Sequence, residues 1–188
     1  MADRIIESAP GEVPEIPALL QSLMSYVLDE GKAKTESGEG VVPFTALAVK
    51  DTLFMEDASA ETPEGCYALA QHTVEGARGA DAYAFCYDGY IDLDDRQVDA
   101  VIAEGGLPGE ETGYAAGFVY TTDKYGKVSF EKQPTYIGLA PNFMAGLKAA
   151  EEYSEDEIND KYQVEEDEAA VEAESAEPIE DAAEETEE

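Results

Sequence analysis

Closely spaced acidic side chains are the residues of this chain best suited to chemistry. They run from Asp88 and Asp92 through Asp94, Asp95 and Asp99 to Glu104. Carboxylate oxygens are the ligands that Mg²⁺, Mn²⁺ and Ca²⁺ prefer. An EF-hand loop beginning at Asp92 fails, because glutamine stands where glycine is required and alanine where the final glutamate is required. Two interpretations remain: a solvated loop between strands, or an irregular metal site with Asp92, Asp94, Asp95 and Glu104 as candidate ligands.

Residues suited to nucleophilic catalysis are few. His72 is the single histidine, and Cys66 and Cys86 are the two cysteines. Cys66 and His72 are six residues apart in a predicted helix, which turns their side chains about 120° away from each other. We expect an exposed His72 and two buried, unreactive cysteines. The sequence leaves any catalytic residue unknown and predicts no cofactor.

Glycines and aromatic residues follow the acidic run. Residues 104–113 are rich in glycine but contain three glutamates and no lysine, so they do not resemble a phosphate-binding loop. They are interpreted as a loop between strands or as a contact for a partner or neutral ligand. The nearby aromatic residues indicate either a sheet face packed under helices or a partner surface. The residues of this candidate surface are Tyr87, Tyr90, Tyr114, Phe118 and Tyr120.

The charge of the chain is strongly negative and unevenly distributed. Its 188 residues contain 44 acids and 11 Lys or Arg, giving a net charge of −33, and residues 151–188 hold 19 acids and one lysine. DNA and anionic membranes would repel such a protein, so neither direct nucleic-acid binding nor membrane binding is expected. The absence of an apolar signal core and of a disulfide framework predicts a cytoplasmic protein.

The pattern along the chain predicts three regions. Residues 1–11 read as a flexible leader that ends at a Pro-Gly pair. Residues 12–153 read as a single folded domain. Residues 154–188 contain too few large apolar side chains to offset the cost of ordering the backbone, so they are predicted to form a disordered acidic tail.

Three segments have helical patterns. Residues 14–30 carry an apolar stripe at helical spacing and are predicted to stop at Gly31. Residues 63–78 begin with Thr62 as N-cap and Pro63 in the first turn. Residues 143–153 are predicted to form a third helix, capped by Asn142.

The remaining segments read as strands joined by short loops. Lys50-Asp51, Asp88-Gly89 and the loop from Asp123 to Gly126 are predicted hairpin turns, and Tyr90 is expected to lie opposite Tyr87. Short loops join antiparallel neighbours. The predicted fold is therefore α+β: a mainly antiparallel sheet of five to seven strands with two or three helices on one face. The predicted strand segments are 42–49, 52–56, 82–87, 90–93, 98–104, 115–122 and 128–133, with 135–138 as an extension of the last one past Pro134.

One stretch resembles a pattern found in small uncharacterised bacterial domains. Tyr87-Asp-Gly-Tyr90, then Val98 to Gly106 ending in Glu-Gly-Gly, then the aromatic strand from Ala115 to Tyr120 carry this resemblance over residues 82–122. It implies a bacterial cytoplasmic protein and no known activity.

Three functions remain open. The first is a binding or accessory protein whose acidic tail engages a basic protein partner or aids solubility. The second is a small metal-dependent hydrolase that uses the carboxylates of residues 88–104. The third is an acidic inhibitor that mimics DNA.

Overall fold

The computed structural model describes residues 14–93, 96–154 and 157–158. The leader predicted over 1–11 lies outside these residues, and so does nearly all of the predicted tail. By its internal contacts the chain divides into residues 1–153 and 154–188. The described elements are α1 (Ala18–Ser37), β1 (Phe44–Val49), β2 (Thr52–Asp57), α2 (Pro63–Glu75), β3 (Ala82–Leu93), β4 (Arg96–Gly106), β5 (Thr112–Thr122), β6 (Val128–Phe130), β7 (Thr135–Pro141) and a short 3₁₀ turn at Ala150–Glu152.

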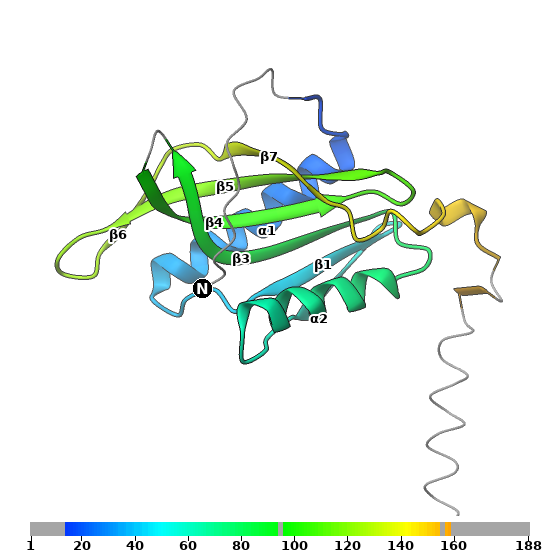
Figure 1. The fold of residues 1–188 in the computed structure, drawn as a ribbon, viewed down its shortest axis with the longest axis horizontal. Coiled ribbons are helices and arrows are strands. Elements are labelled where there is room, and N and C mark those ends of the chain that lie inside the picture. The colour runs from blue at the N-terminus through cyan, green and yellow to red at the C-terminus, as the bar shows by residue number, and fades with distance from the viewer. Residues whose placement is uncertain (1–13, 94–95, 155–156, 159–188) are drawn as a thin grey trace, which may run out of the picture. The chain divides into compact units, whose positions relative to one another are not determined.

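The seven strands form one antiparallel sheet, which confirms the predicted α+β class (Figure 1). The strand order is β2-β1-β3-β4-β5-β6, and β7 also pairs with β5. The long strands β3 and β4 pair from Tyr83↔Gly106 to Leu93↔Arg96 and form the centre of the sheet. The outermost strand at one end of the sheet is β2.

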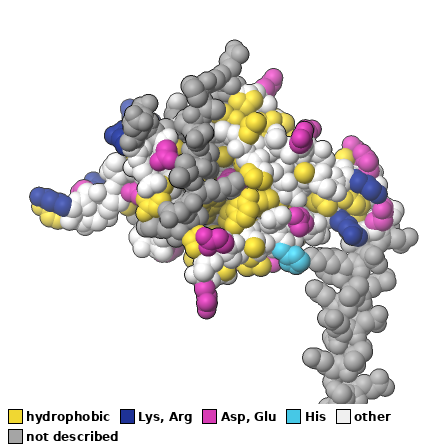
Figure 2. Space-filling model, viewed as in Figure 1, with side chains coloured by type: hydrophobic (Ala, Val, Ile, Leu, Met, Phe, Trp, Pro, Cys, Tyr) yellow, Lys and Arg dark blue, Asp and Glu magenta, His cyan; other side chains and the backbone are white. Residues whose placement is uncertain are grey.

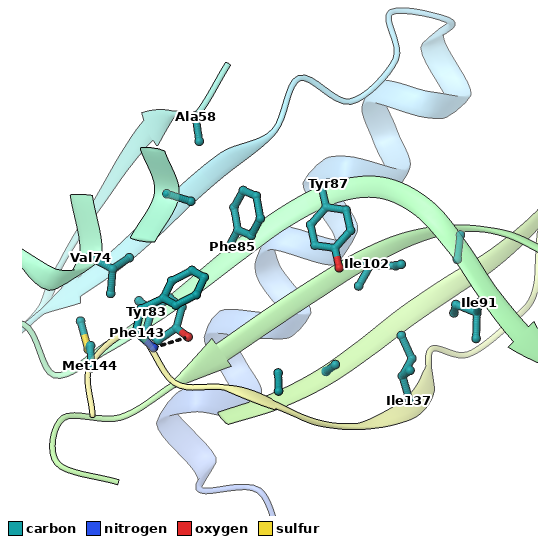
Figure 3. Packing of buried hydrophobic residues seen from close by; sticks show 14 of the residues in the cluster. Ala58, Val74, Tyr83, Phe85, Tyr87, Ile91, Ile102, Ile137, Phe143 and Met144 are labelled. Carbon is teal, nitrogen blue, oxygen red and sulfur yellow. Dashed lines mark hydrogen bonds between the residues drawn. The ribbon is translucent and has the colours of Figure 1, made fainter. Parts of the chain in front are cut away.

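The helices cover opposite faces of the sheet, so the prediction that they share one face is wrong. On β3, Ala82, Ala84 and Cys86 belong to the core beneath α1, whereas Tyr83, Phe85 and Tyr87 belong to the core that includes α2. Figure 3 shows these three aromatic side chains on the side of β3 away from α1. The physical reason is in the sequence of β3, which is apolar at consecutive positions and therefore needs cover on both faces.

Helix α1 continues past Gly31 and ends at Gly38, which adopts a left-handed conformation with φ of 82°. The predicted stop at Gly31 is wrong, because this glycine serves close packing. A Cβ atom at Gly31 would lie 2.6 Å from Val101 Cγ1 and 2.9 Å from Cys86 Sγ. The absence of a side chain therefore lets α1 approach the sheet at this point.

Helix α2 begins as the sequence predicts and ends slightly earlier. The Thr62 side chain accepts a hydrogen bond from the Gly65 amide at 3.1 Å, and Pro63 is the first helical residue. The helix ends at Glu75 rather than at residue 78. Its buried side chains, Ala70 and Val74, contact the aromatic residues of β3 in one core.

Two of the three predicted hairpin turns are confirmed. Lys50 has a φ of 54° in the turn between β1 and β2, and Gly126 has a φ of 84° between β5 and β6. The prediction of a turn at Asp88-Gly89 is wrong, because both residues lie within β3, where Gly89 pairs with Ala100. A Cβ atom at Gly89 would lie 3.2 Å from Ile102 Cδ1. The glycine that suggested a turn therefore permits close packing.

The predicted helix over 143–153 is also wrong. This segment forms turns followed by the 3₁₀ turn at Ala150–Glu152. Asn142 holds the turn: its amide nitrogen donates to the Leu107 and Glu110 carbonyls at 2.7 Å each, and its side-chain oxygen accepts from the Met144 amide at 2.9 Å. These bonds insert Phe143 and Met144 into the core on the α2 side.

Candidate functional site

The candidate metal ligands do not converge where they can be placed. Asp92 is half-buried and pairs with Gln97, whereas Glu104 is fully buried and stands seven residues further along β4. Seven residues of strand span about 23 Å, so these two carboxylates cannot share one ion. Asp94 and Asp95 lie outside the described residues. Among the described residues, no group of three or more His, Cys, Asp or Glu could hold a metal ion.

Glu104 and Tyr87 instead form a buried polar pair in the α2-side core. The Tyr87 hydroxyl donates to Glu104 Oε1 at 2.6 Å, and the exposed fractions of the two residues are 3% and 0%. Burying a carboxyl group in an apolar core is costly unless hydrogen bonds compensate it. Figure 3 shows the Tyr87 ring next to Ile102 in this core. The hydrogen bond therefore gives the Tyr87 and Glu104 side chains a structural role.

A second pair, Asp88 and Tyr120, lies on the other face of the sheet. The Tyr120 hydroxyl donates to Asp88 Oδ1 at 2.8 Å. Burial raises the pKa of the Asp88 carboxyl; the bond from Tyr120 lowers it in part, and the charge of Asp99 raises it again. Burial also raises the pKa of the Tyr120 phenol, and the bond to Asp88 adds to this shift. The hydrogen bond therefore links β3 to β5 on the α1 side of the sheet.

The sequence does not indicate the Asp88–Tyr120 pair: Asp88 belongs to the acidic run and Tyr120 to the candidate aromatic surface. They are 32 positions apart, and only the strand register brings them together. Neither residue carries a local pattern that indicates the other.

The candidate aromatic surface is divided between the two faces of the sheet. Tyr87 is buried on the α2 side. Phe118 and Tyr120 are buried on the α1 side, where the half-buried Tyr114 packs against the same core. Tyr90 is half-buried and pairs with Asp99, not opposite Tyr87 as expected. These five side chains therefore serve mainly as core and do not form one platform.

His72 and the cysteines are placed as predicted. His72 is exposed on α2, and both cysteines are buried free thiols. The Cys86 thiol donates to the Val27 carbonyl at 3.4 Å, and burial raises the pKa of this thiol. A raised pKa keeps the thiol protonated, which makes it a poor nucleophile.

A pocket of about 250 Å³ lies beside the first turn of α2. Its aromatic lining consists of Tyr67, Phe85 and Tyr87, and Cys66 lines it next to the helix start. The Cys66 thiol donates to the Ala60 carbonyl at 3.6 Å and accepts from the Ala60 amide at 3.3 Å. Since these hydrogen bonds engage the thiol within the loop, the pocket offers an apolar wall and no nucleophile paired with a base.

The largest run of exposed apolar side chains along one strand is on β2, which is not among the residues predicted to form a site. Leu53, Phe54 and Met55 are 39%, 54% and 44% exposed. Their pattern in the sequence is that of an ordinary strand, so its position at the edge of the sheet had to come from the structure.

No protein-family model, curated protein or solved structure matches this chain significantly. Across the described segments, no helix is long and apolar enough to cross a membrane.

Proposed function

We propose that this protein is a binding or accessory protein that engages a basic protein partner through its acidic surface and its acidic C-terminal segment. One observation carries the proposal. Within the described part of the chain, Glu104 is the only fully buried carboxylate residue. Apart from Glu104, the acidic residues of the described part of the domain are therefore at least partly exposed. By sequence, residues 1–150 contain 25 acids and 10 bases.

The distribution of charge supports binding by electrostatic attraction. Figure 2 shows Asp and Glu side chains spread over the visible face, with few Lys and Arg among them. Such a surface attracts cations from a distance and accelerates encounter with a basic partner. Residues 151–188 add 19 acids and one lysine to the same chain. We place this activity in the cytoplasm, where two buried free thiols would stay reduced.

The geometry favours this function over carboxylate-based hydrolysis. A hydrolytic metal site needs carboxylates that converge on one ion. Asp92 and Glu104 are separated along the sheet, and Glu104 is hydrogen-bonded to Tyr87.

The test is co-isolation of the full-length protein from its own source cells, followed by affinity measurements with the protein that is recovered. We expect a stoichiometric partner with a strong excess of Lys and Arg. Its affinity should fall at least about tenfold when salt is raised to about 1 M, where the Debye length shrinks to roughly 3 Å. A variant that ends at Tyr153 removes the second unit of the chain and should bind more weakly. Recovery of an acidic partner, or binding that salt leaves unchanged, would overturn the proposal.

A further inference from the structure

Strand β2 presents an open edge of the sheet. It stands at the end of the strand order, and within the described residues it pairs only with β1. All six of its residues are exposed. An edge of this kind presents unpaired backbone N–H and C=O groups to an incoming strand.

The ladder between β1 and β2 shows which backbone groups point outward. Just beyond β2, the Ala58 amide donates to the Pro43 carbonyl at 2.7 Å. In an antiparallel ladder, hydrogen-bonded pairs alternate with non-bonded pairs. Thr52, Phe54 and Glu56 therefore direct their backbone groups toward β1, and Leu53, Met55 and Asp57 direct theirs away from the sheet. These three residues provide the regular spacing that an added strand needs.

The outward-facing side of β2 and the neighbouring flank of helix α1 together carry exposed apolar side chains. The Tyr26 hydroxyl lies 3.8 Å from Met55 Sδ, so this flank of the helix borders β2. Tyr26 is 42% exposed, and Leu19, two turns earlier on the same flank, is 46% exposed. Leu53 lies two residues from Met55 on the same face of the strand. A strand added here would place every second side chain against these exposed apolar residues.

Acidic residues stand at both ends of β2. Asp51 precedes the strand and Glu56-Asp57 ends it, and all three are exposed. Lys50 is the neighbouring cation in the turn. Antiparallel pairing with a second copy of this chain would place Glu56-Asp57 of each strand beside Lys50-Asp51 of the other. Three acids and one lysine would then meet at each end, so a net charge of about −2 would be left there uncompensated. A segment with Lys or Arg at its ends meets opposite charge instead.

From these contacts we infer that β2 is the docking edge for an extended segment of the basic partner, a segment with alternating apolar side chains and Lys or Arg at its ends. The inference rests on the proposed function and adds to it the surface and the form of the ligand. The segment would pair with the backbone of Leu53, Met55 and Asp57 and lay its apolar side chains beside Tyr26.

The test uses the full-length protein and a synthetic peptide of alternating Val and Thr with two Lys at each end. Binding is followed by fluorescence anisotropy, and amide hydrogen exchange is followed by NMR. We expect the peptide to slow exchange at Leu53, Met55 and Asp57 by at least about tenfold, because these amides gain hydrogen bonds. Exchange at Phe54 should change little, since its amide is already bonded to β1.

Two substitutions locate the site. Met55→Pro removes an outward N–H and leaves the ladder to β1 intact, so it should weaken peptide binding at least about tenfold, or about 1.4 kcal/mol. Because proline could also disturb the strand, Met55→Lys provides a variant that keeps the backbone N–H and adds an opposing charge. Leu139→Lys is the matched control, since Leu139 is 60% exposed on β7. It should leave binding unchanged.

Further peptides separate this inference from the proposed function. A peptide with proline at its centre cannot form a continuous ladder. If it binds as tightly as the original, or if both Met55 variants bind normally, the docking edge is wrong and the acidic-surface proposal stands. If a peptide with Glu in place of Lys binds equally well, the basic partner is wrong. If exchange at Leu53 and Met55 slows with protein concentration alone, the occupant is a second copy and the inference is overturned.

Discussion

Gly31 tests whether helix α1 approaches the sheet as closely as described. In the interior of an exposed helix, replacing Gly by Ala stabilises by about 1 kcal/mol. At Gly31 the added Cβ would meet Val101 Cγ1 at 2.6 Å and Cys86 Sγ at 2.9 Å. Overpacking of a well-packed core costs roughly 1–3 kcal/mol. The packing cost exceeds the helical gain, so Gly31→Ala should lower the free energy of unfolding by about 1 kcal/mol.

A double-mutant cycle isolates the contact. Val101→Ala alone should destabilise by about 2 kcal/mol through lost apolar burial. In the double variant, Val101→Ala opens space for the methyl group that Gly31→Ala adds. The double variant should therefore be more stable, by about 1 kcal/mol or more, than the sum of the two single effects predicts. Urea denaturation of the wild type, the two single variants and the double variant gives the four free energies of unfolding that the cycle needs. Ser25→Ala, at an exposed position of the same helix, should stabilise slightly.

The reasoning would be refuted by a simple result. If Gly31→Ala stabilises the protein by about 1 kcal/mol and shows no coupling to Val101, the helix does not approach the sheet at this residue.

Three further predictions follow from individual contacts. Tyr87→Phe should destabilise by about 1–3 kcal/mol in urea denaturation, because it removes the hydroxyl that donates to the buried Glu104. The pKa of Asp88 is raised in the folded state, so the protonated carboxyl favours folding. This contribution to stability is fully present below the unfolded-state pKa of about 3.9 and is lost as the pH rises through the pKa of the folded state. Asp88→Asn should therefore become more stable relative to the wild type as pH rises from about 3 to about 7. Thr62→Ala should destabilise by about 1 kcal/mol through loss of the cap of α2.

Matched controls accompany the Tyr87 and Thr62 changes. Tyr125→Phe removes a hydroxyl from a side chain that is 83% exposed, and Thr122→Ala alters an exposed strand residue. Both should stay within about 0.5 kcal/mol of the wild type. Equal losses in the Tyr87 and Tyr125 variants would contradict the buried pair. A pH profile of Asp88→Asn that parallels the wild type would contradict the raised pKa, and a neutral Thr62→Ala would contradict the cap.

The sequence predicted those features that depend on neighbouring residues. The Thr62 cap and the Lys50-Asp51 turn involve contacts within a few positions of the chain. The alternation of apolar and polar residues and the short loops were sufficient for the antiparallel α+β class. The buried cysteines and exposed His72 followed from their positions on predicted elements.

The errors arose where a local pattern has a long-range cause. Glycine at positions 31 and 89 suggested a helix stop and a turn, but both glycines make room for side chains from a distant strand. Asn142 caps no helix, because its side chain bonds to carbonyls more than thirty residues earlier.

The candidate site was affected in the same way. From the sequence, Glu104 is a candidate metal ligand and Tyr87 a candidate partner-surface residue, whereas the strand register joins the two side chains in the core. The exposed edge of β2 depends on strand order, which the pattern of residues does not contain.

The most direct test of the central claim is carboxyl-to-amine zero-length cross-linking of the full-length protein in a lysate of its own source cells, read by mass spectrometry. If the acidic surface engages a basic partner, Asp and Glu of this chain will cross-link to lysines of one basic protein, with Glu56 and Asp57 among the linked positions. These links will disappear at high salt. Cross-links confined to copies of this chain, or links that persist at high salt, would contradict the account.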